Sequence, residues 1–173
     1  MFMENEKLQE ISRKNTNITF QDIEEDLQKN IKQNYVFPVG ELCDRLDLKV
    51  ELQPLAKGCS GYIDIQSKTI YINNSSEYTA SRMRFTIAHE IAHYVLHEGI
   101  KNRFDENNNY SQEELDQEYE ANDFAGELLM PKNIFINLYK KYKSNLTKIA
   151  DFFGVSTKAV EIRAWRLGLN YSF

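Results

Sequence analysis

The sequence predicts an α+β fold in which a small sheet is followed by a series of helices. Apolar residues alternate with polar ones over much of 49–73, which is the period of half-buried strands. From Thr79 to Glu98 the apolar residues instead recur at helical spacing, and this stretch contains no Gly or Pro. Hydrophobic residues make up 42% of the 173-residue chain and charged residues 27%, so we expect a packed globular core rather than disorder.

The strand-rich part is predicted to be a small antiparallel sheet of three strands. The first strand lies within 49–55, and the runs 62–66 and 69–73 flank a turn at Ser67-Lys68 that joins them as a hairpin. Upstream of the sheet, apolar residues recur about every four positions and predict helices. The expected upstream segments are a polar arm over 1–19, a helix over 20–35 and a short helix over 39–46.

Helices are predicted for most of the second half of the chain. They are expected at 79–98, 113–130 and 133–142, with two shorter helices within 146–167 on either side of Gly154. The polar, Asn-rich stretch 101–112 is predicted to be a loop, and the acidic segment 101–117 is a candidate lid. This pattern divides the chain into a main domain over 20–143 and a helix-turn-helix-like C-terminal segment over 144–173.

Charge and apolar patterning exclude several classes of protein. The net charge of −5 gives no overall attraction to nucleic acid or to anionic membranes. The N-terminus lacks the apolar run of a signal peptide, and no stretch approaches the roughly 20 apolar residues of a membrane-spanning helix. Cys43 and Cys59 are not spaced as metal ligands, so reduced thiols and a cytoplasmic location are expected.

The predicted helix 79–98 carries a candidate metal site. His89 and His93 are four residues apart, so both imidazoles leave the same face of the helix one turn apart and can bind one tetrahedral ion. Glu90, the next residue after His89, is placed to take a proton from metal-bound water as a general base. Zinc is the metal that this His-Glu-x-x-His spacing indicates.

A catalytic zinc ion needs a third protein ligand. His97 lies eight residues from His89, about 12 Å along a straight helix, so we expect it at the helix end or beside a ligand rather than on the ion. In the following helix Glu118 lies at the edge of the apolar face, where a carboxylate needs a positive partner. Glu118 is therefore the predicted ligand and Glu120 the alternative, with Asn122 orienting a ligand through a hydrogen bond. The remaining side of this helix is expected to be solvated, with Glu120, Asp123 and Glu127 on it.

Two runs of sequence resemble a known family. Residues 84–97 resemble the active helix of the ImmA/IrrE family of metallopeptidases, and residues 118–131 resemble its second signature. The resemblance implies a zincin-like fold with Glu118 as the third zinc ligand in a Glu-x-x-x-Asn arrangement. It also implies an endopeptidase that cleaves a helix-turn-helix transcriptional repressor of a phage or other mobile genetic element.

The C-terminal segment allows two interpretations. The spacing of apolar and small residues around Gly154 is typical of a helix-turn-helix, and Lys158, Arg163 and Arg166 fall on its second helix. However, residues 143–173 contain only five basic residues against two acidic ones, a weaker footprint than that of most DNA readers. We therefore favour packing on the peptidase or docking of a protein substrate, with Trp165 and Leu167 as expected core anchors.

Two other classes of function remain open at this stage. The chain could be a regulator that binds a repressor or DNA without cutting, in which case the metal would be structural, or it could belong to a toxin–antitoxin module. For the peptidase, the hairpin over 62–73 is expected to hold the substrate as an added strand. Tyr94 is a candidate for stabilising the oxyanion.

Overall fold

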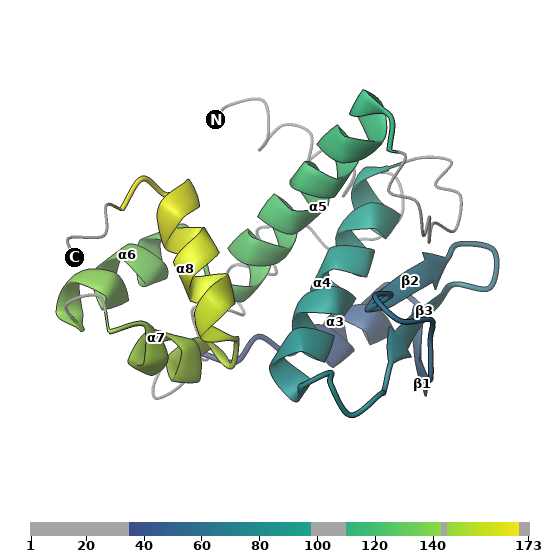
Figure 1. Cartoon of the computed structure of the whole chain (residues 1–173), viewed down its shortest axis with the longest axis horizontal. Coiled ribbons are helices and arrows are strands. Elements are labelled where there is room, and N and C mark those ends of the chain that lie inside the picture. Colours follow the sequence, from purple (N-terminus) through teal and green to yellow (C-terminus); the bar gives the residue numbers. More distant parts are fainter. Residues whose placement is uncertain (1–34, 98–109, 143–144, 170–173) are drawn as a thin grey trace.

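The computed structural model describes residues 35–97, 110–142 and 145–169, and in these ranges the helices and the sheet form the arrangement shown in Figure 1. The predicted arm 1–19, nearly all of the predicted helix 20–35 and most of the Asn-rich loop lie outside the described residues. The elements are α3 (Val39–Arg45), β1 (Lys49–Gln53), β2 (Gly61–Asp64), β3 (Thr69–Asn73), α4 (Ala80–Leu96), α5 (Gln112–Leu129), α6 (Lys132–Lys141), α7 (Leu146–Phe153) and α8 (Thr157–Arg166).

The three strands form a mixed sheet in the order β1-β3-β2. The predicted hairpin is present, because β2 and β3 pair antiparallel with Ile63 opposite Ile70. The expectation of a wholly antiparallel sheet is wrong, because β1 pairs parallel to β3, with Val50 beside Ile70. Alternating apolar residues identify a strand but carry no information on the direction of its neighbour. In this order β2 is an edge strand.

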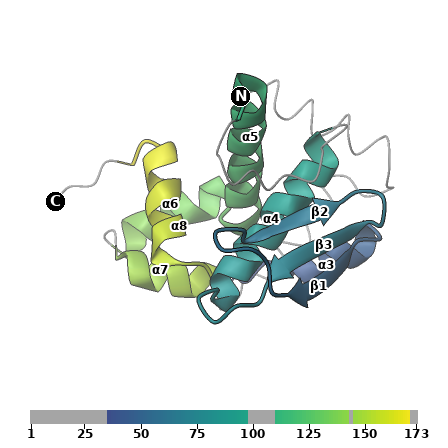
Figure 2. The same ribbon diagram turned by 45° about the vertical axis from the view of Figure 1, so that its right-hand side comes forward.

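Helix α4 is the central element of the molecule. It contacts β2 and β3 on one side and α5 on the other, and Figure 2 shows it lying across a face of the sheet. The Thr79 side chain caps its N-terminus by accepting a hydrogen bond from the Arg82 N–H. Ala88 and Ala92 are fully buried, so the neighbouring elements approach closely. The helix ends at Leu96, slightly earlier than expected, and His97 follows in extended conformation.

Helix α5 packs against α4 through the face that the sequence predicts. Ala121, Ala125 and Leu129 are fully buried and Leu128 is nearly so, while Phe124 packs at the edge of the core. Ser111 and Glu114 form a capping box that fixes where the helix begins. Because α4 and α5 lie against each other along their length, side chains near their shared edge can converge on one site.

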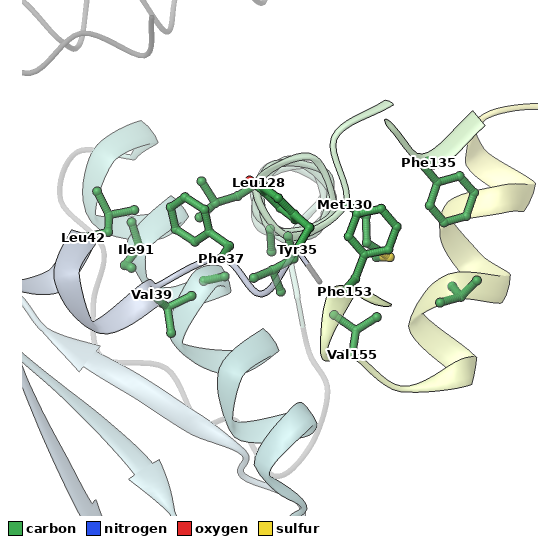
Figure 3. Packing of buried hydrophobic residues seen from close by; sticks show 14 of the residues in the cluster. Tyr35, Phe37, Val39, Leu42, Ile91, Leu128, Met130, Phe135, Phe153 and Val155 are labelled. Carbon is green, nitrogen blue, oxygen red and sulfur yellow. The ribbon is translucent and has the colours of Figure 1, made fainter. Parts of the chain in front are cut away.

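The C-terminal helices share a core with the rest of the molecule. Phe153 of α7 stacks on Phe135 with 6.1 Å between ring centroids and meets Tyr35 edge-on at 5.9 Å. Figure 3 shows Tyr35 and Phe37 connecting the residues around α4 with those around Phe153. The predicted turn between α7 and α8 is present, because Gly154 adopts φ +63 as the left-handed cap of α7.

The expectation that Trp165 is a core anchor is wrong, because this residue is 72% exposed. The buried side of α8 contains Val160 and Ala164, one turn apart, together with Arg163. Trp165 lies five residues after Val160, which turns it well away from that side at 100° per residue. Leu167, the other expected anchor, packs at the edge of the core.

Neither cysteine forms a disulfide. Cys43 and Cys59 are both free and buried. Within the described ranges, no helix combines the length and the apolar character needed to cross a bilayer.

Candidate metal centre

The two histidines of α4 face each other across one helical turn. The Nε2 atoms of His89 and His93 lie 2.9 Å apart, and their rings meet edge-on with 4.6 Å between centroids. His93 is buried, and the His89 side chain is only 15% exposed. This is the arrangement that the four-residue spacing predicts.

Glu118 of α5 completes the cluster. Its Oε2 lies 3.3 Å from His89 Nε2 and its Oε1 lies 3.1 Å from His93 Nε2. A tetrahedral zinc ion with bonds of about 2.0–2.1 Å keeps its ligand atoms about 3.3 Å apart. The three side chains are therefore spaced as a metal of this kind requires, and they form a group that could hold an ion.

The pKa shifts in the cluster follow from contacts between opposite charges. Burial by itself would raise the pKa of Glu118, but hydrogen bonds from His89 and His93 outweigh it and hold that pKa well below its usual range. Burial lowers the pKa of His89, yet its contacts with Glu118, Glu90 and Asn122 leave the pKa raised. Glu118 is thus kept as a carboxylate, the form that ligates a metal.

Glu90 lies beside the cluster and is 7% exposed. Burial raises its pKa, and the nearby imidazoles of His89 and His93 only partly oppose that shift. A raised pKa makes the carboxylate a better proton acceptor near neutral pH than an exposed glutamate. The carboxylate also accepts a hydrogen bond from the backbone N–H of Ile63 in β2, so it is held at the edge of the sheet.

The edge strand β2 lies directly on α4. The Asn73 N–H donates to the Ser60 carbonyl at 2.9 Å, and in an antiparallel pair such bonded positions alternate with unbonded ones. Gly61 and Ile63 are therefore positions at which the backbone of β2 points away from β3 and toward the free edge. A Cβ at Gly61 would lie 2.7 Å from Thr86 Cγ2, so only glycine permits this close approach.

The structure separates the two candidate carboxylates. Glu118 faces the histidine pair, whereas Glu120 Oε2 contacts His97 Nε2 at 3.2 Å. His97 Nδ1 lies 3.1 Å from His93 Nδ1. On the His93 ring, Nδ1 is on the opposite edge from Nε2, the atom that faces Glu118. Burial lowers the pKa of His97, although Glu120 opposes that shift. His97 thus lies beside a predicted ligand, and Asn122 hydrogen-bonds His89 as expected.

Two acidic residues expected to be solvated instead bind α8. Arg163 is buried, donates from Nε to the Met130 carbonyl at 3.1 Å and forms an ion pair with Glu127. Arg166 forms an ion pair with Asp123. The pattern of polar and apolar residues in α5 could not predict these ion pairs, because it contains no information about partners 36 and 43 residues further along the chain.

These pairs occupy the basic residues that suggested a DNA-binding helix. Lys158, the third of them, is paired with Glu161 of the same helix at 2.6 Å. Each Lys and Arg of α8 therefore has an acidic partner within the protein.

The remaining predicted residue, Tyr94, lies toward the hairpin. Its side chain hydrogen-bonds Lys68, at the turn between β2 and β3. The candidate lid over 101–117 begins outside the described residues, and its described end forms the start of α5.

A small α+β fold with a His-Glu-x-x-His helix and a carboxylate from the next helix defines the zincin-like class of metallopeptidases. Residues 43–164 match the family model Peptidase_M78, described as an IrrE N-terminal-like domain. The chain therefore belongs to this family of peptidases. The match extends through α7 and most of α8, so it is not confined to the predicted main domain.

Among solved structures, the chain is similar to a Mycobacterium tuberculosis transcriptional regulator. The TM-score is 0.54 and the identity 17%, over 90% of this chain and 50% of that one. At this identity the likeness shows the fold alone, and the chain spans about half the length of that protein. Comparison with curated proteins gives no match.

Proposed function

We propose that this protein is a zinc-dependent endopeptidase, with His89, His93 and Glu118 as ligands and Glu90 as the general base. The observation that carries the proposal is the convergence of three side chains beside a buried glutamate: the two Nε2 atoms lie 2.9 Å apart, and the Glu118 oxygens lie 3.3 and 3.1 Å from them. A buried helix has little reason to present two imidazoles and a carboxylate to one point unless they share a partner. Membership of a peptidase family supports the same conclusion.

The roles of the residues follow from their positions. When bound, zinc would polarise the scissile carbonyl and lower the pKa of a water molecule at the site. Glu90 would accept the proton of that water and pass it to the leaving amine, because its carboxylate adjoins the cluster and its pKa is raised by burial. The Ile63 N–H would keep the carboxylate oriented during both transfers.

The substrate would bind as an extended strand along β2. The Gly61 N–H and the Ile63 carbonyl are directed to the free edge, where a peptide could add to the sheet, while the Ile63 N–H is bonded to Glu90. Because Ile63 also contacts Glu90, a peptide on this edge would pass directly by the general base. An edge strand this short provides few hydrogen bonds, so we expect additional docking contacts elsewhere on the protein.

We further propose that the protein acts in the cytoplasm and that its substrate is a transcriptional repressor of a mobile genetic element. The sequence resemblance to ImmA/IrrE peptidases supports this class of substrate. The internal ion pairs of Arg163 and Arg166 favour a protein rather than DNA as the partner.

A non-cleaving regulator with a structural metal is the second candidate, and a toxin–antitoxin component is a weaker one. The observation that favours a regulator is the fold similarity to a protein described as a transcriptional regulator. The helix-turn-helix-like pair α7 and α8 would suit either role.

The Glu90→Gln variant separates these functions. It should bind zinc as wild type does and fold normally, because Gln keeps the size and can still accept the hydrogen bond from Ile63. Proteolysis of a candidate helix-turn-helix repressor by wild type, detected as fragments by electrophoresis and mass spectrometry, should be lost in the variant. A regulator that acts without cutting would retain its effect on repressor-controlled transcription in this variant, and that result would contradict the peptidase proposal.

A further inference from the structure

A chain of hydrogen-bonding groups extends from the back of His93. His97 Nδ1 lies 3.1 Å from His93 Nδ1, and His97 Nε2 lies 3.2 Å from Glu120 Oε2. The His97 side chain is only 4% exposed. His97 takes this position because α4 ends at Leu96 and the next residue adopts extended backbone angles, φ −119 and ψ 126.

With a metal held by His89, His93 and Glu118, the contacts behind His93 would be consistent with one set of proton positions. His93 Nε2 faces His89 and Glu118, so it must carry a lone pair if it is to bind a metal. His93 then carries its hydrogen on Nδ1 and donates it to His97 Nδ1. His97, an acceptor at Nδ1, carries its own hydrogen on Nε2 and donates it to the Glu120 carboxylate. Every polar atom along this path has a partner.

We propose that His97 is a positioning residue that, together with Glu120, holds His93 in the tautomer and orientation needed to bind the metal. The inference rests on the proposed metal site and adds a role for two residues outside it. Metal-binding histidines generally donate their second N–H to a carboxylate or carbonyl. Here an imidazole is interposed, which lets His93 of α4 reach a carboxylate on α5.

The two metal-binding histidines are supported by different residues. Asn122 of α5 hydrogen-bonds His89, and the His97–Glu120 pair supports His93. Helix α5 thus supplies the ligand Glu118 and one supporting side chain for each histidine. Loss of such support generally weakens metal binding by about 10- to 100-fold.

Two substitutions at position 97 distinguish positioning from packing. His97→Asn shortens the side chain but places Oδ1 near the position of Nδ1, so it can still accept from His93. His97→Phe keeps a ring of similar size but offers no acceptor. If His97 positions His93, the Asn variant should bind metal nearly as tightly as wild type, and the Phe variant about 10- to 100-fold more weakly.

The measurement is the dissociation constant for zinc, and for cobalt as a spectroscopic probe, by chelator competition on the full chain. The metal-free variants would be checked by circular dichroism and thermal unfolding. If His97 only fills space, the order of zinc affinities should be reversed, with the Phe variant binding nearly as tightly as wild type and the Asn variant more weakly. That result would overturn the proposal while leaving the metal site intact. Failure of wild type to bind either metal would overturn the metal site and this inference together.

Glu120 provides the matching test on the second helix. Glu120→Gln can still accept from His97 Nε2 and should change the zinc dissociation constant little, whereas Glu120→Leu should weaken binding by up to about tenfold. The side chain of Glu120 is 53% exposed, so neither substitution should affect the stability of the metal-free fold. Equal affinities in the Leu variant and wild type would remove Glu120 from the proposal.

Discussion

At the scale of single residues, Glu90, the proposed general base, shows how a buried carboxylate can reduce stability. Its carboxylate is buried, and burial raises its pKa because the charged form loses hydration. For an acid whose pKa is higher in the folded than in the unfolded state, ionisation above the unfolded value of 4.5 favours unfolding. Keeping an ionisable base at this position therefore lowers stability at neutral pH.

Because the pKa of Glu90 is raised by folding, the difference in stability between wild type and Glu90→Gln should depend on pH. Below the unfolded pKa both side chains are neutral, and the two metal-free proteins should be about equally stable. As pH rises through the folded pKa, wild type should lose stability relative to the variant. Urea unfolding between pH 4 and pH 8 on chelator-treated protein would measure the difference. A difference that does not change over this range would contradict the assignment of a raised pKa to Glu90.

Glu118 and Glu120 differ in the atoms that they contact, which makes them a matched pair for metal analysis. Glu118→Ala removes the oxygen atoms that lie 3.1 and 3.3 Å from the two histidines, so stoichiometric zinc should be lost. Glu120→Ala removes only the contact with His97, so zinc should remain stoichiometric at saturating metal. Elemental analysis of both variants beside wild type would decide. Equal zinc content in all three proteins would exclude Glu118 as a ligand.

At the scale of elements, the ion pairs between α5 and α8 anchor the C-terminal helices. Arg163 is buried against Glu127 and the Met130 carbonyl, so truncation would remove the side-chain donor of that carbonyl and of Glu127 Oε2. Arg163→Ala should lower the free energy of unfolding by about 1–3 kcal/mol, since Glu127 remains partly accessible to water. Lys158→Ala, which breaks an exposed pair within α8, should change it by less than about 1 kcal/mol. Denaturant unfolding would compare them, and equal effects would show that the buried pair contributes no anchoring.

The edge strand β2 can be tested for substrate binding without cleavage. In a Glu90→Gln background the proposed repressor substrate should bind intact. Adding Gly61→Pro removes an N–H that faces the free edge and should weaken binding about tenfold, the effect of one lost hydrogen bond of about 1.4 kcal/mol. Gly61→Ala is the control, because it introduces the same Cβ beside Thr86 but keeps the N–H. Binding would be measured by calorimetry, and equal losses in both double variants would argue against strand addition.

Elements whose signals are local could be predicted from the sequence, and those that depend on distant partners could not. The helices expected over 79–98 and 113–130 from their apolar faces match α4 and α5 within a few residues. The direction of β1 relative to β3 and the exposure of Trp165 depend on how the elements pack. Among the described residues, the prediction therefore succeeded for the helices and failed for the strand direction.

In the candidate site too, contacts set by local sequence could be predicted and contacts set by distant elements could not. The histidine pair depends on one helix and Glu118 on the face of a second, and the structure brings these three side chains together. The contact of Glu90 with Ile63 depends on the position of an edge strand, and that of His97 with Glu120 depends on where α4 ends. The sequence did carry one signal for the contact of His97 with the site. Three histidines recur at four-residue intervals, which places His97 on the same face of the helix as His93.

At the scale of the whole molecule, the proposed metal ion would link elements that are far apart in sequence. His89 and His93 belong to α4, Glu118 to α5, and α5 is joined to α8 by the pairs of Arg163 and Arg166. A metal bound here would therefore stabilise the fold beyond the site, because the unfolded chain does not hold the three ligands together.

Removal of the metal should consequently lower the thermal stability of the entire protein. A ligand present at about 1,000 times its dissociation constant stabilises the folded state by about 4 kcal/mol, which corresponds to a change in Tm on the order of 10 °C for a chain of this length. Calorimetry before and after chelation, with zinc added back, would measure the shift. The Glu118→Ala variant, which lacks one ligand, should unfold at nearly the same temperature with and without zinc. If zinc instead shifted the Tm of wild type and variant equally, it would be stabilising the protein from a different site, and the ligand set of His89, His93 and Glu118 would have to be abandoned.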